Sequence, residues 1–255
     1  MATIKEVKEQ LAALTDLDDH RWASFEEDSR AGIQTAIKQR RKAIQAEIAE
    51  EERLEVMLSY EKSLYAQGVE LIAGVDEVGR GPLAGPVCAA AVILPDGYEI
   101  PGLNDSKQLT DKKRRELFPI IKEQAVAYGV AMVDEKTIDE VNILNATFMA
   151  MKDAISQLSV RPDLALIDGN RTSEFGVEAI PVVKGDARDA SIAAASILAK
   201  VTRDTFMEEM DKQYPEYGFA VHKGYGTRRH YDAIREYGMC PIHRRTFLKK
   251  FYGEQ

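Results

Sequence analysis

The chain has 255 residues, enough for one large domain or for a domain with a sizeable extension, and it can bury a proper core. Its formal net charge of -8 argues against a protein that coats nucleic acid by bulk attraction, because such a surface repels phosphates. The charge is uneven, however, since residues 219–251 carry eight basic and two acidic side chains. The basic side of the protein is therefore at its C-terminal end.

Cysteine usage and hydropathy narrow the class further. Cys88 and Cys240 lack the paired spacing of a zinc site or a disulfide framework, so both are expected to be reduced thiols. Residues 1–10 lack the basic-then-apolar pattern of a secretory signal, and no apolar stretch approaches the roughly 18 residues of a membrane span. These features predict a soluble, cytoplasmic protein with no membrane partner.

The first part of the chain carries helix signals and no strand signal. Thr3 with Glu6 and Ser24 with Glu27 have the spacing of a capping box. Isoleucines recur near the helical period at Ile33, Ile37, Ile44 and Ile48.

We expect this region to form a helical N-terminal extension over residues 1–68, ending near Gly68, followed by a catalytic domain over residues 69–255. A solvated helical arm with many surface charges is the favoured interpretation of the extension, and a dedicated binding module is the alternative.

From residue 71 onward the pattern changes to short β-branched and apolar runs. Five strands are predicted, at residues 71–78, 87–94, 128–134, 164–168 and 179–183. Three helices are predicted at residues 111–127 after Thr110, 138–158 after a Thr137/Glu140 capping box, and 190–210 after Asp189. The order β-β-α-β-α-β-β-α predicts an α/β fold in which helices pack on a mixed sheet.

Two adjacent carboxylates, Asp76 and Glu77, end the first predicted strand, which is otherwise apolar. Neighbouring side chains of a strand point to opposite faces, so one carboxylate faces a site while the other must reach it from the strand end or edge. Two like charges so placed need a cation. The plain alternative is a surface loop with chance acidic residues.

The glycines around this pair weaken that alternative. Gly79, Gly81 and Gly85 let the backbone approach a ligand closely, and Arg80 offers a forked cation to a phosphate. The segment at residues 74–87 therefore reads as catalytic and phosphate-facing.

Further acidic residues follow two later strands. Asp168 stands directly before Gly169, where an Asx turn is an equal alternative to a site role. Asp186 lies just beyond the last strand and is free for a functional role, whereas Asp189 is explained as a helix N-cap. In the helix after it, Ser196, Lys200 and Arg203 form a polar strip opposite alanines, which an ordinary amphipathic helix would also show.

Four carboxylates at strand ends suit hard divalent cations such as Mg²⁺ and Mn²⁺, which prefer oxygen ligands. No histidine or cysteine cluster in the sequence competes for zinc. Two such ions about 4 Å apart activate water and stabilise the leaving oxygen in phosphodiester hydrolysis.

A basic, glycine-rich stretch with interleaved tyrosines lies at residues 222–232. Tyr225 and Tyr231 suit stacking on nucleotides and the basic residues suit phosphates, although a basic surface turn with core tyrosines is a fair rival. Residues 105–110 place Ser106 and Lys107 in a loop before a helix, which alone is an ordinary helix start.

Taken in order, six of these segments resemble type 2 ribonuclease H, the bacterial ribonuclease HII. They are GVDEVGRGPLAGPV, NDSKQL, LIDGN, VVKGD, ASILAKVTRD and HKGYGT, and the similarity spans roughly residues 71–245. The resemblance implies an RNase H-like fold and two-metal hydrolysis, with Mn²⁺ or Mg²⁺, of the RNA strand in RNA–DNA hybrids and at single ribonucleotides embedded in duplex DNA. It implies 5′-phosphate and 3′-hydroxyl products and a role in ribonucleotide excision repair and DNA replication.

The resemblance also implies roles for particular residues. The four acidic metal-site positions fall on Asp76, Glu77, Asp168 and Asp186. Substrate-binding positions fall on Gly79, Arg80, Gly81, Lys107, Lys200 and Tyr225. Of these, the glycine-arginine-glycine segment is expected to address the ribose 2′-hydroxyl and its phosphate, and the tyrosine to sense the RNA–DNA junction.

The acidic arm has no counterpart in shorter family members, and its lack of strands separates the chain from the type III enzymes, whose N-terminal domain is sheet-based. Two rival functions remain open. One is a DNA nuclease or resolvase of the same fold. The other is a non-catalytic hybrid-binding protein. The sequence names no protein partner in replication or repair.

Overall fold

The computed structural model describes residues 2–97 and 100–253 and contains two compact units, residues 1–55 and 56–255. The first unit is helical: it consists of α1 (Ile4–Ala12), α2 (Arg21–Glu26) and the greater part of α3 (Ala31–Tyr65). Its core is made of seven buried apolar side chains. They are Val7, Leu11, Leu14, Trp22, Ile33, Ile37 and Ile44.

Of the two capping boxes predicted for this unit, one is confirmed and the other is wrong. Thr3 and Glu6 form the predicted capping box, with the Thr3 side chain accepting from the Glu6 amide. The Ser24–Glu27 box is wrong, because α2 has already begun at Arg21 and the Ser24 hydroxyl donates to the Arg21 carbonyl. Ile48 also differs from the other isoleucines, since it is 40% exposed.

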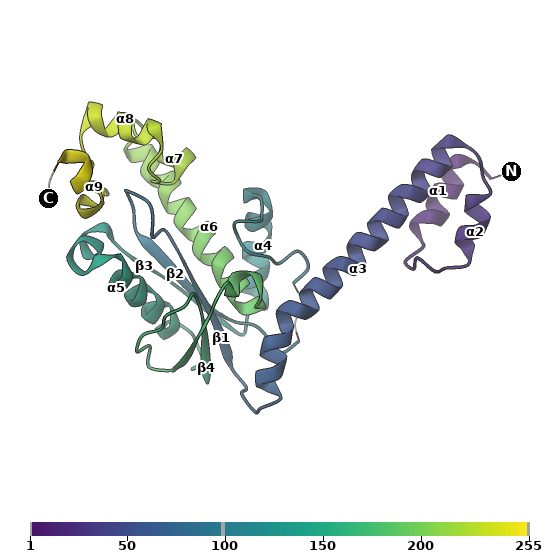
Figure 1. Ribbon diagram of the computed structural model, residues 1–255, viewed down its shortest axis with the longest axis horizontal. Helices are drawn as coiled ribbons and strands as arrows, with labels where there is room; N and C mark the ends of the chain where they lie inside the picture. The colour runs from purple at the N-terminus through teal and green to yellow at the C-terminus, as the bar shows by residue number, and fades with distance from the viewer. Residues whose placement is uncertain (1, 98–99, 254–255) are drawn as a thin grey trace. The chain divides into compact units, whose positions relative to one another are not determined.

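The second unit is built on a five-stranded mixed sheet in the order β3-β2-β1-β4-β5 (Figure 1). Its strands are β1 (Ile72–Val78), β2 (Val87–Ile93), β3 (Ala127–Val133), β4 (Leu164–Asp168) and β5 (Glu178–Val182). The pairs β1–β2 and β2–β3 are antiparallel, whereas β1–β4 and β4–β5 are parallel. The five predicted strands are confirmed, with ends that differ by at most one residue, and so is the mixed sheet.

The helices of this unit cover both faces of the sheet. They are α4 (Asp111–Gln124), α5 (Glu135–Ser156), the 3-10 turn η1 (Gly185–Ala187), α6 (Ala190–Gln213), α7 (Phe219–His222), α8 (Arg228–Tyr237) and α9 (Arg245–Tyr252). α5 packs on one face against a cluster that includes Val75, Val87 and Ile167. α6 packs on the opposite face, where Ile192 meets Ile72. None of the helices within the described ranges could span a lipid bilayer.

One of the three predicted helix starts differs in the structure, and the same helix contains a kink. α5 begins at Glu135, earlier than predicted, because Asp134 is the N-cap and accepts from the Thr137 amide. The Thr137/Glu140 capping box is therefore wrong. The chain is kinked at Asn142 (φ 69°), whose side-chain oxygen accepts from the two amides that follow it at Leu144 and Asn145. Thr110 and Asp189 do cap α4 and α6 as predicted.

The last turns of α3 contribute to the core of the catalytic unit. Leu64 is buried with Ile72 and Ile192, and the rings of Tyr60 and Tyr65 pack against the same cluster. The compact units divide between Glu55 and Val56, so the boundary at Gly68 stays a prediction.

Two truncations test that boundary. Deleting residues 2–55 is expected to leave the catalytic unit with its full core, whereas deleting residues 2–68 removes Leu64 and should cost roughly 2–5 kcal/mol of unfolding free energy. Thermal denaturation followed by circular dichroism, with the full chain as control, measures the difference. Equal Tm values for the two truncations would instead support a boundary at Gly68.

Candidate active site

Asp76 lies on β1 with its side chain on the α6 face of the sheet, where it is 3% exposed. Ser196 of α6 lies against this carboxylate and shares a hydrogen bond of 2.7 Å with the Ser106 hydroxyl, and the Glu77 amide donates to Asp76 Oδ1 at 2.7 Å. α6 can approach so closely because Gly74 has no side chain: a Cβ there would stand 2.2 Å from the Ile192 nitrogen. The alanine-rich sequence of α6 thus fixes the environment of the first carboxylate.

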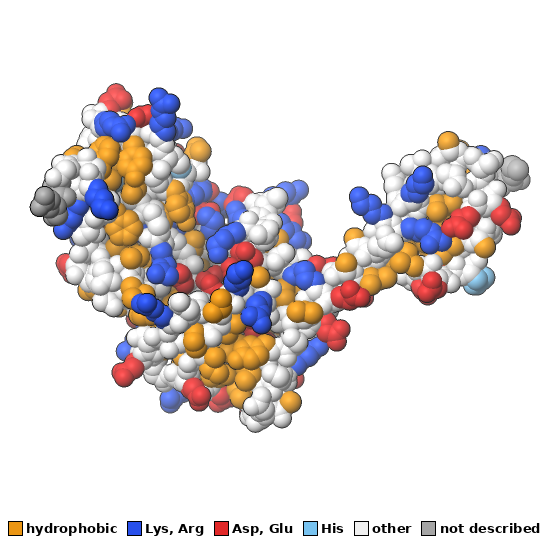
Figure 2. Space-filling view, in the orientation of Figure 1, with side chains coloured by type: hydrophobic (Ala, Val, Ile, Leu, Met, Phe, Trp, Pro, Cys, Tyr) orange, Lys and Arg blue, Asp and Glu red, His pale blue; other side chains and the backbone are white. Residues whose placement is uncertain are grey.

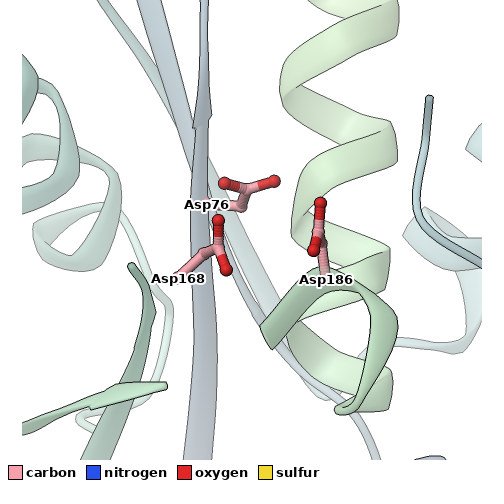
Figure 3. Close-up of side chains that lie close together, drawn as sticks. All are labelled: Asp76, Asp168 and Asp186. Atoms are coloured by element: carbon pink, nitrogen blue, oxygen red, sulfur yellow. The ribbon is translucent and has the colours of Figure 1, made fainter. Parts of the chain in front are cut away.

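Asp168 and Asp186 approach Asp76 from two other elements. Asp168 ends β4, and its Oδ1 accepts from the Gly185 amide at 2.7 Å. Asp186 lies in η1, where the left-handed backbone of Lys184 (φ 56°) turns the chain back after β5. One carboxylate oxygen from each of the three aspartates lies within 4.8 Å of the other two. Figure 3 shows the three side chains gathered beside one another.

The electrostatics of this group favour a cation. Burial raises the pKa of Asp76 well above its ordinary value, and the charges of Glu77 and Asp168 raise it further. Burial and the neighbouring Asp186 likewise raise the pKa of Asp168. The Lys107 ammonium, 3.1 Å from Asp186 Oδ2, offsets part of this repulsion. The donor set, three carboxylates converging from three elements, fits a hard divalent ion.

Glu77 is not part of this group of three. It follows Asp76 in the strand and so points to the α5 face, where a pocket of about 340 Å³ is lined by Glu77, Arg80, Asp168 and residues of α5. Its Oε1 lies 3.3 Å from the Arg80 guanidinium. Burial raises the pKa of Glu77, and the charge of Arg80 opposes that shift. Glu77 and Asp168 therefore both line this pocket at the end of the sheet.

The glycine segment after β1 lies beside Tyr225. A Cβ at Gly81 would stand 3.6 Å from the Tyr225 ring, and the ring itself is 42% exposed. Gly79 has a φ of 92°, a conformation that favours glycine. The Arg80 side chain is half exposed, so its guanidinium is accessible at the edge of the site.

The two predicted lysines lie in different surroundings. Lys107 contacts the carboxylate group through Asp186, and this ion pair raises its pKa although partial burial opposes the change. Lys200 instead pairs with Asp204 one turn along α6, with 2.8 Å between the ammonium and Oδ1. Among the described residues, Lys200 is thus placed in a neighbouring ion pair and not against the three aspartates.

Sequence reasoning missed two arginines that hold the site loops in place. Arg203 of α6 is fully buried and donates to the carbonyls of Pro86, Lys223 and Ala84. Arg244, also fully buried, donates to the carbonyls of Gly85, Arg80 and Gly79. In the sequence Arg203 stood out only as a member of the polar strip with Ser196 and Lys200, and Arg244 was hidden in a run of basic residues.

Comparison with known proteins identifies the family. The sequence profile described as Ribonuclease HII matches residues 73–250, and the profile described as Ribonuclease HII N-terminal domain matches residues 3–65. This chain belongs to the ribonuclease HII family. The resemblance seen in the motifs is confirmed, and with it the assignment as a metal-dependent endoribonuclease that acts on the RNA strand of RNA–DNA hybrids.

Solved structures agree with this family. The ribonuclease H2 of Pyrococcus horikoshii OT3 is 30% identical, with a TM-score of 0.61 over 72% of this chain and 97% of the other. The ribonuclease HII of Archaeoglobus fulgidus, solved as a complex with PCNA, is 25% identical, with a TM-score of 0.58 over 68% of this chain and 93% of the other. The RNase H-like fold with an N-terminal helical region is therefore confirmed.

Metal binding at the three aspartates can be measured without substrate. Because an ion that binds only the folded state stabilises it, Mn²⁺ at about one hundred times its Kd is expected to raise the unfolding free energy by roughly 3 kcal/mol. Asp168→Asn should lose most of the accompanying rise in Tm, whereas Asp153→Asn, an exposed residue of α5, should keep it. A rise of the same size in Asp168→Asn would contradict the placement of the ion.

Proposed function

We propose that this enzyme cuts the RNA strand of RNA–DNA hybrids and also cuts at single ribonucleotides embedded in duplex DNA, by two-metal catalysis that leaves 5′-phosphate and 3′-hydroxyl ends. The observation that carries the proposal is the position of the three converging aspartates beside a glycine-arginine-glycine loop whose Gly81 faces Tyr225. Carboxylates alone support hydrolysis of any nucleic acid. The adjacent glycine-arginine-glycine loop and the Tyr225 ring can contact the sugar and so distinguish RNA from DNA.

In this proposal Asp76, Asp168 and Asp186 hold Mn²⁺ or Mg²⁺ on the α6 face, and Glu77 contributes from the α5 face. Divalent ions held there supply activation of the attacking water and neutralisation of the leaving oxygen. The protein's task is to keep the three aspartates converged, with Glu77 at the same end of the sheet, before the ions arrive. Lys107 supports this by partly neutralising Asp186 and by presenting a cation to a substrate phosphate.

Recognition of the ribose is assigned to the backbone at Gly79 and Gly81. A single 2′-hydroxyl is the chemical difference between RNA and DNA at a lone ribonucleotide, and glycines let main-chain groups reach it. Arg80 engages the neighbouring phosphate through its exposed guanidinium. Tyr225 stacks on the sugar of the next nucleotide, where a 2′-hydroxyl would press against the ring, so the site prefers RNA followed by DNA.

The C-terminal segment suits the phosphates of the duplex. Figure 2 shows Lys and Arg side chains gathered over α8 and α9, at the top left of the view. The side chains of Arg228 and Arg235 are 96% and 62% exposed. Lys200 is assigned a supporting role through Asp204.

We further propose a role in ribonucleotide excision repair and DNA replication. The solved complex of the Archaeoglobus fulgidus protein with PCNA supports a replication protein as partner.

Asp76→Asn tests the catalytic assignment, because it removes one charge from the three-carboxylate group while preserving shape. We expect a nearly complete loss of cleavage at saturating Mn²⁺ with the fold retained, and no loss in Asp153→Asn. Cleavage of a labelled hybrid and circular dichroism measure the two properties. Activity within tenfold of the parent would refute the role of Asp76. A binding protein without activity would leave the hybrid intact, and a DNA nuclease of this fold would cut an all-DNA duplex.

Tyr225→Ala tests junction recognition. If the variant loses stacking on the sugar, the activation free energy from kcat/KM should rise by roughly 1–3 kcal/mol more at a lone ribonucleotide than within a long hybrid. Tyr225→Phe keeps the ring and should behave like the parent on both substrates. The values of kcat/KM on the two substrates decide, and an equal loss on both would make Tyr225 a structural or general catalytic residue.

A further inference from the structure

Three of the four histidines lie together beneath the Tyr225 loop. His222 of α7, His230 of α8 and His243 before α9 are 8%, 0% and 3% exposed. Their rings are mutually close: His222 stacks on His230 with 4.5 Å between centroids, and His230 lies 5.2 Å from His243. The edge of Phe219 closes the group from another side. Buried imidazoles of this kind are retained only when their nitrogens have partners.

The hydrogen bonds fix which nitrogen of His243 carries a proton. The Cys240 amide donates to His243 Nδ1 at 2.9 Å, and a backbone N–H cannot accept, so Nδ1 is the bare nitrogen. The Cys240 thiol, 3.1 Å away, is a second donor toward the same atom. The Cys240 carbonyl lies farther off, at 3.3 Å, and already accepts from the His243 amide. Neutral His243 therefore carries its proton on Nε2.

The position of the proton on His243 determines which nitrogen of His230 is protonated, and His230 contacts Tyr225. His243 Nε2 lies 3.0 Å from His230 Nε2, so His243 donates and His230 accepts. His230 then carries its proton on Nδ1 and donates to the Tyr225 carbonyl at 2.9 Å. A single directed chain runs from the Cys240 amide through two imidazoles to the backbone of Tyr225.

His222 holds the other side of the same residue. The Gly224 amide donates to His222 Nδ1 at 3.2 Å, which leaves Nε2–H to donate to the Tyr217 carbonyl at 2.8 Å. Gly224 is further fixed by its left-handed backbone (φ 85°), because a Cβ there would stand 2.5 Å from the Ala84 carbonyl oxygen. The amide before Tyr225 and the carbonyl of Tyr225 are thus each tied to a histidine.

We propose that His230, oriented by His243, is a positioning residue that fixes the backbone of Tyr225 and thereby sets the preference for the RNA–DNA junction. The inference rests on the proposed function of Tyr225 and adds the reason why an exposed ring on a glycine-flanked loop keeps one orientation. His222 supports the same backbone from the N-terminal side.

The hydrogen bonds from Cys240 to Tyr225 require uncharged histidine rings, and the buried surroundings favour the uncharged form. Burial lowers the pKa of His230 and of His243 to about 4, and burial also lowers the pKa of His222. Burial raises the pKa of the Cys240 thiol to about 11, so that it stays a donor. Two charged groups act on His222: Arg229 of α8 disfavours its charged form, and Asp211 of α6 favours it. Glu216 and Glu135 act on the Cys240 thiol and raise its pKa further.

The sign of the pH dependence follows from these shifts. Between about pH 4 and the ordinary histidine value of 6.5, the unfolded chain binds more protons at these positions than the folded chain, so stability rises with pH. Protonation of His230 would place two N–H groups opposite each other between His230 and His243, and protonation of His243 would place its Nδ1–H opposite the Cys240 amide. The series of hydrogen bonds from Cys240 to Tyr225 is therefore intact at neutral pH and is lost as the pH falls toward about 4.

Nitrogen-15 NMR of the full chain at pH 7.5, without substrate, tests the tautomers directly. Long-range proton–nitrogen correlations distinguish the two neutral forms and the cation, and His20→Asn removes the signals of the exposed fourth histidine. We expect His230 as the Nδ1–H form, with His222 and His243 as the Nε2–H forms, and His230 and His243 neutral down to about pH 5. A His230 that is cationic or protonated on Nε2 would overturn the proposal.

A matched pair of variants tests the consequence for selectivity. His230→Asn keeps an N–H that can reach the Tyr225 carbonyl, whereas His230→Leu removes it at similar size. The measured quantity is the ratio of kcat/KM at a lone ribonucleotide to kcat/KM within a long hybrid. His230→Leu should lower this ratio roughly tenfold, as expected for one lost hydrogen bond, while His230→Asn stays within about threefold of the parent. His20→Asn, in the N-terminal unit, is the unaffected control.

The possible outcomes separate this proposal from the proposed function. An unchanged ratio in folded His230→Leu, or an equal fall in both variants, refutes the positioning role. If the parent does not cut at a lone ribonucleotide, the proposed function itself fails, while the substrate-free NMR experiment still decides the tautomers. If His230→Leu does not fold, His230→Asn and the tautomers decide, because loss of selectivity in folded His230→Asn also refutes the role.

Discussion

Two buried guanidiniums hold together the loops that carry the site. Arg203 and Arg244 donate six hydrogen bonds to main-chain carbonyls, five of them in residues 79–86 and one at Lys223. Neither forms an ion pair within the described part of the chain. Burial lowers the pKa of both, in the case of Arg244 to about 9. Each carbonyl left unpaired in this interior would cost roughly 1–3 kcal/mol, so the loop and the arginines stabilise each other.

This arrangement links the strand that carries Asp76 to the loop that carries Tyr225. The loop at residues 79–86 begins directly after β1, which carries Asp76, and Arg203 extends from α6, the helix that covers this aspartate. The same arginine reaches the Lys223 carbonyl, two residues before Tyr225. The histidine chain then fixes Tyr225 from beneath. The three aspartates and Tyr225 are therefore attached to one scaffold and need no separate alignment.

The sequence was sufficient for those features that depend on local pattern. The strands were predictable because β-branched runs are bounded by turns, and Asp76, Asp168 and Asp186 because each follows or ends such a run. The start of α5 was not, because Asp134 competes with Thr137 as a cap and only the folded chain decides between them. Arg203 and Arg244 were not predictable either, since their partners lie more than one hundred residues away except at Lys223.

The N-terminal boundary also depends on a distant buried interaction. Glu61 of α3 is 1% exposed and accepts from the Ser191 amide at 3.3 Å, beside Asp189, the N-cap of α6. Burial raises the pKa of both carboxyls, and the charge of Glu61 raises the pKa of Asp189 further. Asp189 stands three residues after Asp186, and the end of α3 thereby helps to fix the turn that carries Asp186. A motif search that begins at β1 omits Glu61, because nothing in the local sequence around it indicates a role in the catalytic unit.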